Sequence, residues 1–374
     1  MENPKPRKSV RYTAYALFGL LIFTVIVLAL EFYFRSRPEY GRAGYSYDPN
    51  LIFRLTPGLA AQKPHAWGKT GKPPYTLRFN NFGFRGPDIN WEKAPGTRSR
   101  VLVLGDSYTA GLDYPDSLIF TGQWERILNA GGPKQYEVLN ASCPSWGTDQ
   151  EYVFWKHEGI RLKPDKVVVM FCPNDVREMW NHNMVRIGPD GEHIVIDKVH
   201  IPFKERMGWK LSANSSLFQY LQQKVFHSNY GDFFRIFRFY PVNYGIRDST
   251  DWDMPMYLDP SIPVIDESYQ LLEKLFADMK KDCDEIGAEL HLVKIPIRME
   301  VDSTYAAPGL SPFMVEERLK GIAERAGIPF HNFNALLREQ PDPKDIFMDW
   351  EYHYDQDGHD FIARSLFATI KSEK

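Results

Sequence analysis

The sequence contains few cysteines and carries little net charge, and each of these features excludes some classes of protein. Its three cysteines, Cys143, Cys172 and Cys283, form no CxxC pair, so neither a structural zinc site nor any other metal is expected. An odd number leaves at least one thiol free. A disulfide between Cys143 and Cys172 stays open, because a sequence does not supply the geometry that such a bond requires. The formal net charge of -3, without a basic stripe beyond the N-terminus, argues against a nucleic-acid partner.

Internal repeats and low-complexity tracts are also missing, which argues against a repeat architecture. With 374 residues, the chain is long for one compact domain, so we expect one large domain with additions, or two domains. Aromatic residues are plentiful at 14%, which suits a core and also suits a surface that faces carbohydrate or membrane. No cofactor is predicted.

A long apolar run lies near the N-terminus, from Tyr12 to Leu30. A helix needs about 20 such residues to cross a bilayer. A cleaved signal peptide is the alternative, but its apolar core spans only about 7–15 residues and ends at a small-residue cleavage site. We therefore predict a cytoplasmic tail at 1–11 and a transmembrane anchor at 12–34, with the main domain in the periplasm or outside the cell, because basic residues before the run favour a cytoplasmic N-terminus.

The remainder of the chain divides by its pattern. Residues 35–97 are rich in Pro, Gly, Tyr and Asn, and we interpret them as an extension packed on the main domain at 98–374. That domain alternates apolar strands with amphipathic helices, which indicates an α/β fold: a three-layer sandwich around a central, mainly parallel, five-stranded sheet. The expected strands are 100–104, 136–140, 166–171, 289–295 and 328–333.

The alternation breaks between 176 and 263, in an aromatic insertion. The sequence predicts a hairpin there at 185–195, with Pro189-Asp-Gly191 at its turn. The insertion either shapes access to a site or forms a lateral subdomain without a role in binding.

Chemistry-bearing residues follow the strands. Ser107, in Gly105-Asp-Ser107, comes directly after the first strand, where a hydroxyl is exposed at the strand-to-helix turn. A helix N-cap is the alternative role for this serine. A serine nucleophile needs a base, and His353 lies just before the last helix, with Glu351 and Asp349 upstream to orient it. His359 competes for the role, but it falls inside the predicted helix.

Acyl transfer also needs donors for an oxyanion. The segment Phe171-Cys-Pro-Asn-Asp175 ends the third strand and places Asn174 at the carboxyl edge of the sheet, with turn chemistry as the alternative role for this Asn. Residues 140–149 end the second strand in the same region, and their backbone amides are further candidates.

Taken together, these segments resemble the four motif blocks of the SGNH, or GDSL, hydrolases, and Asn80-Asn-Phe-Gly-Phe-Arg-Gly86 resembles bacterial members with an N-terminal anchor. The resemblance runs from about Arg98 to the C-terminus, apart from the insertion. It implies Ser107 as nucleophile and His353 as base. It implies an oxyanion hole from the amides of Ser107 and Ser145 and the side chain of Asn174.

The blocks depart from the family pattern at two places. Ser145 stands where the family has Gly, and Gly147 could substitute if the loop is shifted. Cys172 replaces the Gly of the third block. The family acid usually precedes the His by two or three residues, which favours Glu351 before Asp349.

The resemblance implies a serine esterase that acts on acyl esters, for which O-acetyl groups of a cell-surface glycan are a candidate. An O-acetyltransferase on a polysaccharide and a non-catalytic binding protein of the same fold are the alternatives.

Overall fold

The computed structural model describes residues 8–36, 44–63, 65–199, 201–226, 254–301, 308–349 and 352–370. The chain divides into two compact units. Unit 1 comprises residues 1–46 and 203–239, and unit 2 comprises 47–202 and 240–374. Residues 227–253, which belong to the predicted insertion, lie outside the described ranges.

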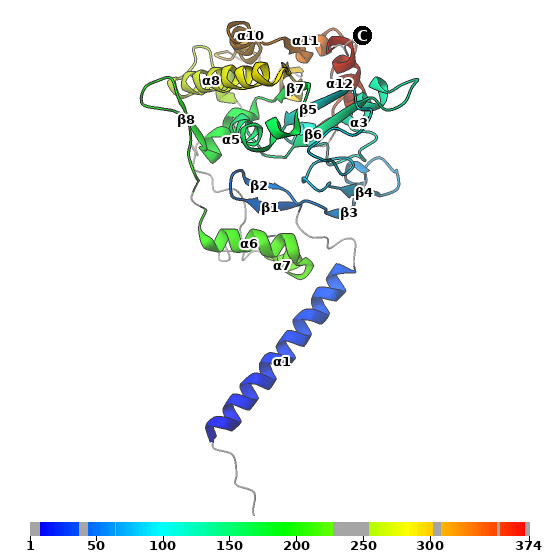
Figure 1. Cartoon of the computed structure of the whole chain (residues 1–374), viewed down its shortest axis with the longest axis vertical. Coiled ribbons are helices and arrows are strands. Elements are labelled where there is room, and N and C mark those ends of the chain that lie inside the picture. Colours follow the sequence, from blue (N-terminus) through cyan, green and yellow to red (C-terminus); the bar gives the residue numbers. More distant parts are fainter. Residues whose placement is uncertain are drawn as a thin grey trace, which may run out of the picture. The chain divides into compact units, whose positions relative to one another are not determined.

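Unit 1 contains a long apolar helix and two shorter helices. Helix α1 spans Lys8–Arg35, and α6 and α7 span Phe203–Asn214 and Ser216–Phe226 (Figure 1). Within Arg11–Arg35, the most apolar window of 18 residues has a mean hydropathy of 2.5, and none of that window is buried. It is therefore long and apolar enough to cross a membrane.

Unit 2 is built on a five-stranded parallel sheet in the order β11-β10-β7-β5-β6. The strands are β5 (Ser99–Gly105), β6 (Tyr136–Ser142), β7 (Lys166–Phe171), β10 (Glu289–Lys294) and β11 (Phe330–Asn332). Every residue of β7 is buried, as expected for a central strand covered on both faces. The chain steps from β6 past β5 to β7, so the strand order reverses between β5 and β7. Ligands bind at such switch points, beyond the carboxyl ends of the strands.

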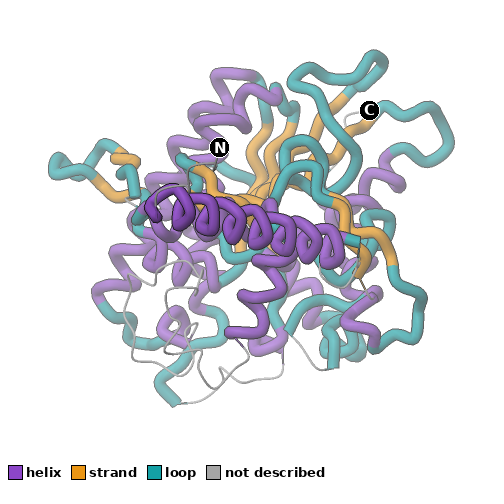
Figure 2. Tube along the Cα trace, turned by 90° about the horizontal axis from the view of Figure 1, so that it is seen from below, coloured by secondary structure: helices purple, strands orange, loops and turns teal. Residues whose placement is uncertain are grey.

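Helices lie on either side of these strands (Figure 2), which confirms the predicted α/β sandwich. Helix α3 (Phe120–Leu128) packs on α12 (Gln356–Thr369), and α8 (Pro263–Ile286) packs on α10 (Met314–Ala326) and α4 (Thr148–Phe154). The shorter helices are α2 (Ser107–Ala110), α5 (Asn174–His182), α9 (Arg298–Val301) and α11 (Phe333–Arg338).

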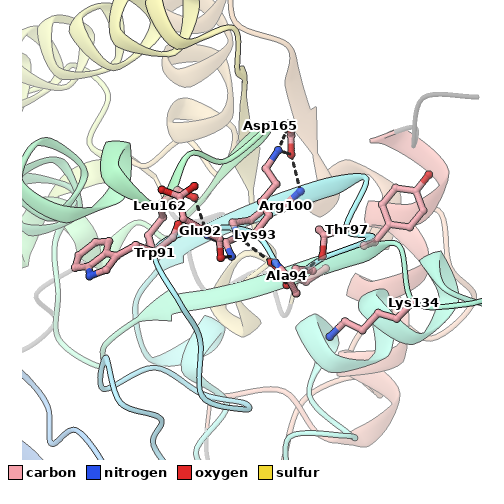
Figure 3. A network of polar contacts seen from close by, with 12 residues as sticks. Trp91, Glu92, Lys93, Ala94, Thr97, Arg100, Lys134, Leu162 and Asp165 are labelled. Atoms are coloured by element: carbon pink, nitrogen blue, oxygen red, sulfur yellow. Dashed lines mark hydrogen bonds and ion pairs between the residues drawn. The ribbon is translucent and has the colours of Figure 1, made fainter.

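A buried arginine fixes the segment that precedes β5, the first strand of the parallel sheet (Figure 3). Arg100, in β5, is 1% exposed, and its guanidinium donates to the carbonyls of Trp91, Glu92 and Leu162 and to the Glu137 carboxylate. Because a buried charge is costly unless it is paired and hydrogen-bonded, these acceptors are needed to keep the guanidinium in place. The segment before β5 is thereby fixed to the start of the sheet.

The extension forms two small sheets. One consists of β1 (Tyr45–Asp48) and β2 (Ile52–Leu55), and the other of β3 (Ala60–Lys63) and β4 (Tyr75–Arg78). Its Arg85 forms an isolated bridge to Asn140 of β6, the edge strand. The Phe84 ring packs edge-on against Phe154 of α4 at 5.3 Å.

The hairpin predicted within the insertion is confirmed. Strands β8 (Val185–Ile187) and β9 (Ile194–Ile196) pair antiparallel, and the Asp190 carboxylate accepts from the amides of Glu192 and His193 in the turn.

Candidate active site

Ser107 and His353 meet at the carboxyl edge of the sheet. Ser107 is the first residue of α2, directly after β5 and Asp106, and His353 lies in the loop before α12. Their Oγ and Nε2 atoms are 2.7 Å apart. This distance lies within the hydrogen-bond reach that a nucleophile and its general base require. Gly105 permits the turn, because a Cβ there would lie 2.2 Å from the Thr109 hydroxyl.

Asn174 lies beside this pair, at the start of α5. Its Nδ2 donates to the carboxylate of Asp106 at 2.9 Å, while its Oδ1 is buried without a hydrogen-bond partner among the described residues. Asp106 is fully buried and also accepts from the Tyr108 amide. An amide nitrogen has two hydrogens, so Nδ2 keeps a second donor for another acceptor.

Ser145 adopts a backbone conformation that usually favours glycine. The Trp146 amide donates to the Cys143 carbonyl, with Pro144 and Ser145 between them. Ser145 has a φ of 64°. A Pro followed by a residue of positive φ is typical of a type II turn, where Gly is favoured. Ser145 is exposed, and its amide is held at this turn in spite of its Cβ.

Gly147 occupies a different position from Ser145. It is buried and precedes α4, and its amide donates to the Gln150 side chain at 3.3 Å. A Cβ on Gly147 would lie 2.7 Å from the Asp175 carbonyl, so close packing explains the glycine. The described geometry therefore favours Ser145 over Gly147 as an oxyanion donor.

A second residue with positive φ lies in the extension, directly before the residue whose carbonyl accepts from the Trp146 side chain. Ile52 has a φ of 66°, and the Phe53 amide donates to the Leu51 carbonyl across it. This is a γ-turn of the rare type with positive φ, which is costly for a β-branched residue. Two carbonyls of this γ-turn accept hydrogen bonds. The Phe53 carbonyl accepts from Trp146 Nε1, in the loop after β6, at 3.0 Å, and the Leu51 carbonyl accepts from the Gln150 side chain, in α4, at 2.7 Å.

The loop that carries His353 is braced from three directions. The Tyr108 ring lies 4.6 Å from the imidazole, and its hydroxyl donates to the Tyr352 carbonyl. The Tyr354 hydroxyl donates to the Pro296 carbonyl, and Arg298 donates to the Met348 carbonyl, both at 2.8 Å. These contacts tie the loop to α2 and to the segment after β10.

Two of the remaining predicted residues are located, and one is not. Asp349 is exposed, and no hydrogen bond joins it to His353 within the described structure. Glu351 lies outside the described residues, so its role stays a prediction. His359 is buried in α12, with Nδ1 facing the Phe120 amide at 3.4 Å, and burial lowers its pKa to about 3. This neutral, enclosed imidazole occupies a packing position.

Four buried carboxyl groups lie close enough to interact electrostatically, and one of them belongs to Asp106, the residue before Ser107. Asp106, Asp149, Glu151 and Asp175 are all at most 1% exposed. Burial raises the pKa of Asp106, even though the Asn174 hydrogen bond and the charge of His353 lower it. Burial also raises the pKa of Asp149 to about 7 and holds those of Glu151 and Asp175 far above the usual range. Burial therefore disfavours the ionised form of each of these carboxyl groups.

Sequence reasoning missed Asp106, Tyr108 and Ile52. The first two flank Ser107 in the sequence, so their proximity was visible, but their partners lie about 70 to 250 residues away along the chain. Ile52 gave no signal, because an isoleucine does not favour positive φ. All three cysteines lie in the described part of the chain and are buried, and no disulfide joins Cys143 to Cys172.

No protein-family profile and no curated protein matches this chain. Among solved structures, TesA is similar at 12% identity and a TM-score of 0.40, covering 73% of this chain and 98% of its own. The α/β hydrolase enzyme LAE5, from the metagenome of Lake Arreo, is 13% identical with a TM-score of 0.42, covering 73% and 95%. The acetylxylan esterase Axe2 from Geobacillus stearothermophilus is 16% identical with a TM-score of 0.41, covering 74% and 96%. At these values the activity has to be argued from the side chains themselves.

Proposed function

We propose that this chain is a serine ester hydrolase with Ser107 as its nucleophile. The observation that carries the proposal is the 2.7 Å approach of Ser107 Oγ to His353 Nε2 at the switch point of the sheet. The four sequence blocks that resemble SGNH hydrolases supply the rest of the argument, because Asn174 and Ser145 lie in loops at the same edge.

In the first half of the reaction, Ser107 Oγ attacks the carbonyl carbon of the ester while His353 Nε2 takes its proton. The negative oxygen that forms is stabilised by the amides of Ser107 and Ser145 and by the free hydrogen on Asn174 Nδ2, each contributing roughly 10²–10³ in rate. The tetrahedral intermediate then expels the alcohol, which receives the proton from His353, and an acyl-enzyme remains.

In the second half, a water molecule gives its proton to His353 and attacks the acyl carbon. Collapse of this second intermediate returns the proton to Ser107 Oγ and releases the acid. A carboxylate that accepts from His353 Nδ1 would hold the imidazole in the required tautomer. Glu351 is our first choice for that group, since Asp349 makes no such contact.

Hydrolysis of p-nitrophenyl acetate by the full chain in detergent tests the proposal. We expect Ser107→Ala to abolish turnover and labelling by a fluorophosphonate probe, because both need the hydroxyl. Ser117→Ala, an exposed serine on a neighbouring loop, is the control. Equal turnover in Ser107→Ala and the unaltered chain would sink the assignment.

For the location and substrate, we propose that α1 anchors the chain in a membrane and that the esterase acts on O-acetyl groups of a cell-surface glycan. The exposed apolar surface of α1 supports the anchor, and the basic residues before it favour a cytoplasmic N-terminus. Release of acetate from an acetylated polysaccharide tests the substrate. If p-nitrophenyl acetate is cleaved but no acetylated glycan is, the glycan proposal fails and the esterase proposal stands.

A further inference from the structure

The end of α1 is tied to the start of α7 by a set of hydrogen bonds. The Glu31 carboxylate accepts from the Ser215 hydroxyl at 2.7 Å and from the amides of Ser216 and Leu217 at 3.1 Å each. Arg35 pairs with Glu31 and donates to the Asn214 carbonyl at 2.7 Å. A carboxylate at a helix N-terminus satisfies amides that have no partner within the helix and interacts favourably with the helix dipole.

An aromatic contact reinforces this junction. The rings of Phe34 and Tyr220 stack with centroids 4.3 Å apart, and Phe34 is only 9% exposed. The junction therefore holds α1 and α7 together by polar and apolar contacts. Since Glu31 directly follows the apolar run Tyr12–Leu30, the first turn of α7 is held at the level where that run ends.

Helix α6, which leads into α7, has an unusual exposed face. Phe203, Met207 and Leu211 follow one another at intervals of four residues, so they share one side of the helix. They are 68%, 39% and 42% exposed. The opposite side is buried and includes Trp209, Ser212 and Ala213. A helix on a water-exposed surface normally places polar residues outward, and α6 places apolar ones there.

We propose that the exposed face of α6 lies in the headgroup region of the same bilayer that α1 spans, as an interfacial helix. The inference rests on the proposed anchoring by α1. Lipid is the expected partner of this face, because α6 is joined to the membrane-spanning helix. Glu31 and Arg35 hold the junction of α6 and α7 at the end of the apolar run of α1. Lys210, exposed beside the apolar residues, suits contact with anionic headgroups.

The consequence is a two-point attachment. A single spanning helix leaves the chain free to swivel, whereas an interfacial helix joined to it limits how unit 1 turns against the membrane. Because Lys210 is exposed beside the apolar residues, we expect this lipid surface to carry some negative charge.

Site-directed spin labelling of the full chain in nanodiscs of phosphatidylcholine and phosphatidylglycerol tests this. Met207→Cys and Leu211→Cys place labels on the proposed contact, Leu20→Cys places one in the middle of α1, and Lys320→Cys on α10 is the aqueous control. The native cysteines are buried, so they should not react. Collisions with oxygen, which concentrates in lipid, are compared with collisions with a water-soluble nickel chelate.

We expect labels at 207, 211 and 20 to show an oxygen-to-nickel ratio several-fold above that at 320. An aqueous ratio at 207 and 211 with a lipid ratio at 20 overturns the interfacial contact and leaves the anchor standing. An aqueous ratio at 20 overturns the anchor and the contact with it. Shielding of 207 and 211 from both reagents shows that protein, such as a second copy of the chain, covers the face, and this also overturns the inference.

Discussion

Trp146→Phe isolates the contribution of the Ile52 turn to the site. The indole Nε1 donates to the Phe53 carbonyl at 3.0 Å, and the two residues are 1% and 2% exposed. The substitution removes the indole donor and leaves the buried Phe53 carbonyl without this hydrogen bond, which lowers the free energy of unfolding by about 1–3 kcal/mol. In domains of 150–250 residues each kcal/mol lowers the melting temperature by about 2–4 °C, and the longer unit 2 should respond in the lower part of that range.

The same change should slow turnover, because Trp146 follows Ser145 directly. If the turn loosens, the Ser145 amide is misplaced, and a 1 Å displacement of a positioned group can cost about 10²-fold. We therefore expect kcat for p-nitrophenyl acetate to fall up to that amount, with KM changed far less.

Trp124→Phe is the matched control for both measurements. Trp124 is also 1% exposed, but its Nε1 has no hydrogen-bond partner among the described residues, so the substitution loses volume and no hydrogen bond. Scanning calorimetry and steady-state kinetics on the two variants give the comparison. Equal losses of melting temperature and of kcat in both would refute a role for the Phe53 hydrogen bond.

Three further predictions concern neighbouring groups. Asn174→Ala should lower kcat for p-nitrophenyl acetate by about 10²–10³ with KM nearly constant, since the donor acts mainly on the developing oxyanion; a change in KM alone in steady-state kinetics would contradict this. Ser145→Gly should raise the melting temperature and keep activity, because glycine avoids a left-handed backbone cost of about 1–2 kcal/mol; a lower melting temperature would count against the strain. Burial raises the pKa of Asp149 from 3.8 to about 7, so the native state resists its ionisation and loses about 4 kcal/mol of stability as pH rises from about 4 to 7. The free energy of unfolding of Asp149→Asn, measured with a denaturant at several pH values, should not show that decline. If it fell with pH as steeply as that of the unaltered chain, the Asp149 carboxyl would not be its cause.

The framework of the fold could be predicted from local patterns. Strands such as β7 are nearly continuous apolar runs in the sequence. A strand that is buried on both faces requires such a run, because its side chains point into the core on either side. Parallel strands end at one edge of a sheet, which is why Ser107 and Asn174 could be placed together before their contacts were known. His353 could be placed there too, because it lies just before the last helix of the alternation.

The geometry that completes the site could not be predicted, because it arises from contacts between distant segments. The positive φ of Ser145 depends on a turn held by the extension, and Ile52 has a conformation opposed to its own preference. The hydrogen bond from Asn174 to Asp106 joins two loops that share no local pattern. Which carboxylate orients His353 also remains a prediction, as Glu351 is not among the described residues.

Arg85 gives the extension a part in how unit 2 folds. Its guanidinium is wholly enclosed and donates to the carbonyls of Ala110, Gly111 and Tyr114 and to the Asp116 carboxylate. The first of these acceptors belongs to the last residue of α2, and the other three lie just after that helix. Before the extension docks, these acceptors would face water or remain unsatisfied, and the loop would have no fixed shape. The sheet and the extension should therefore melt in one cooperative transition, and the smallest active fragment has to begin well before the first strand of the sheet.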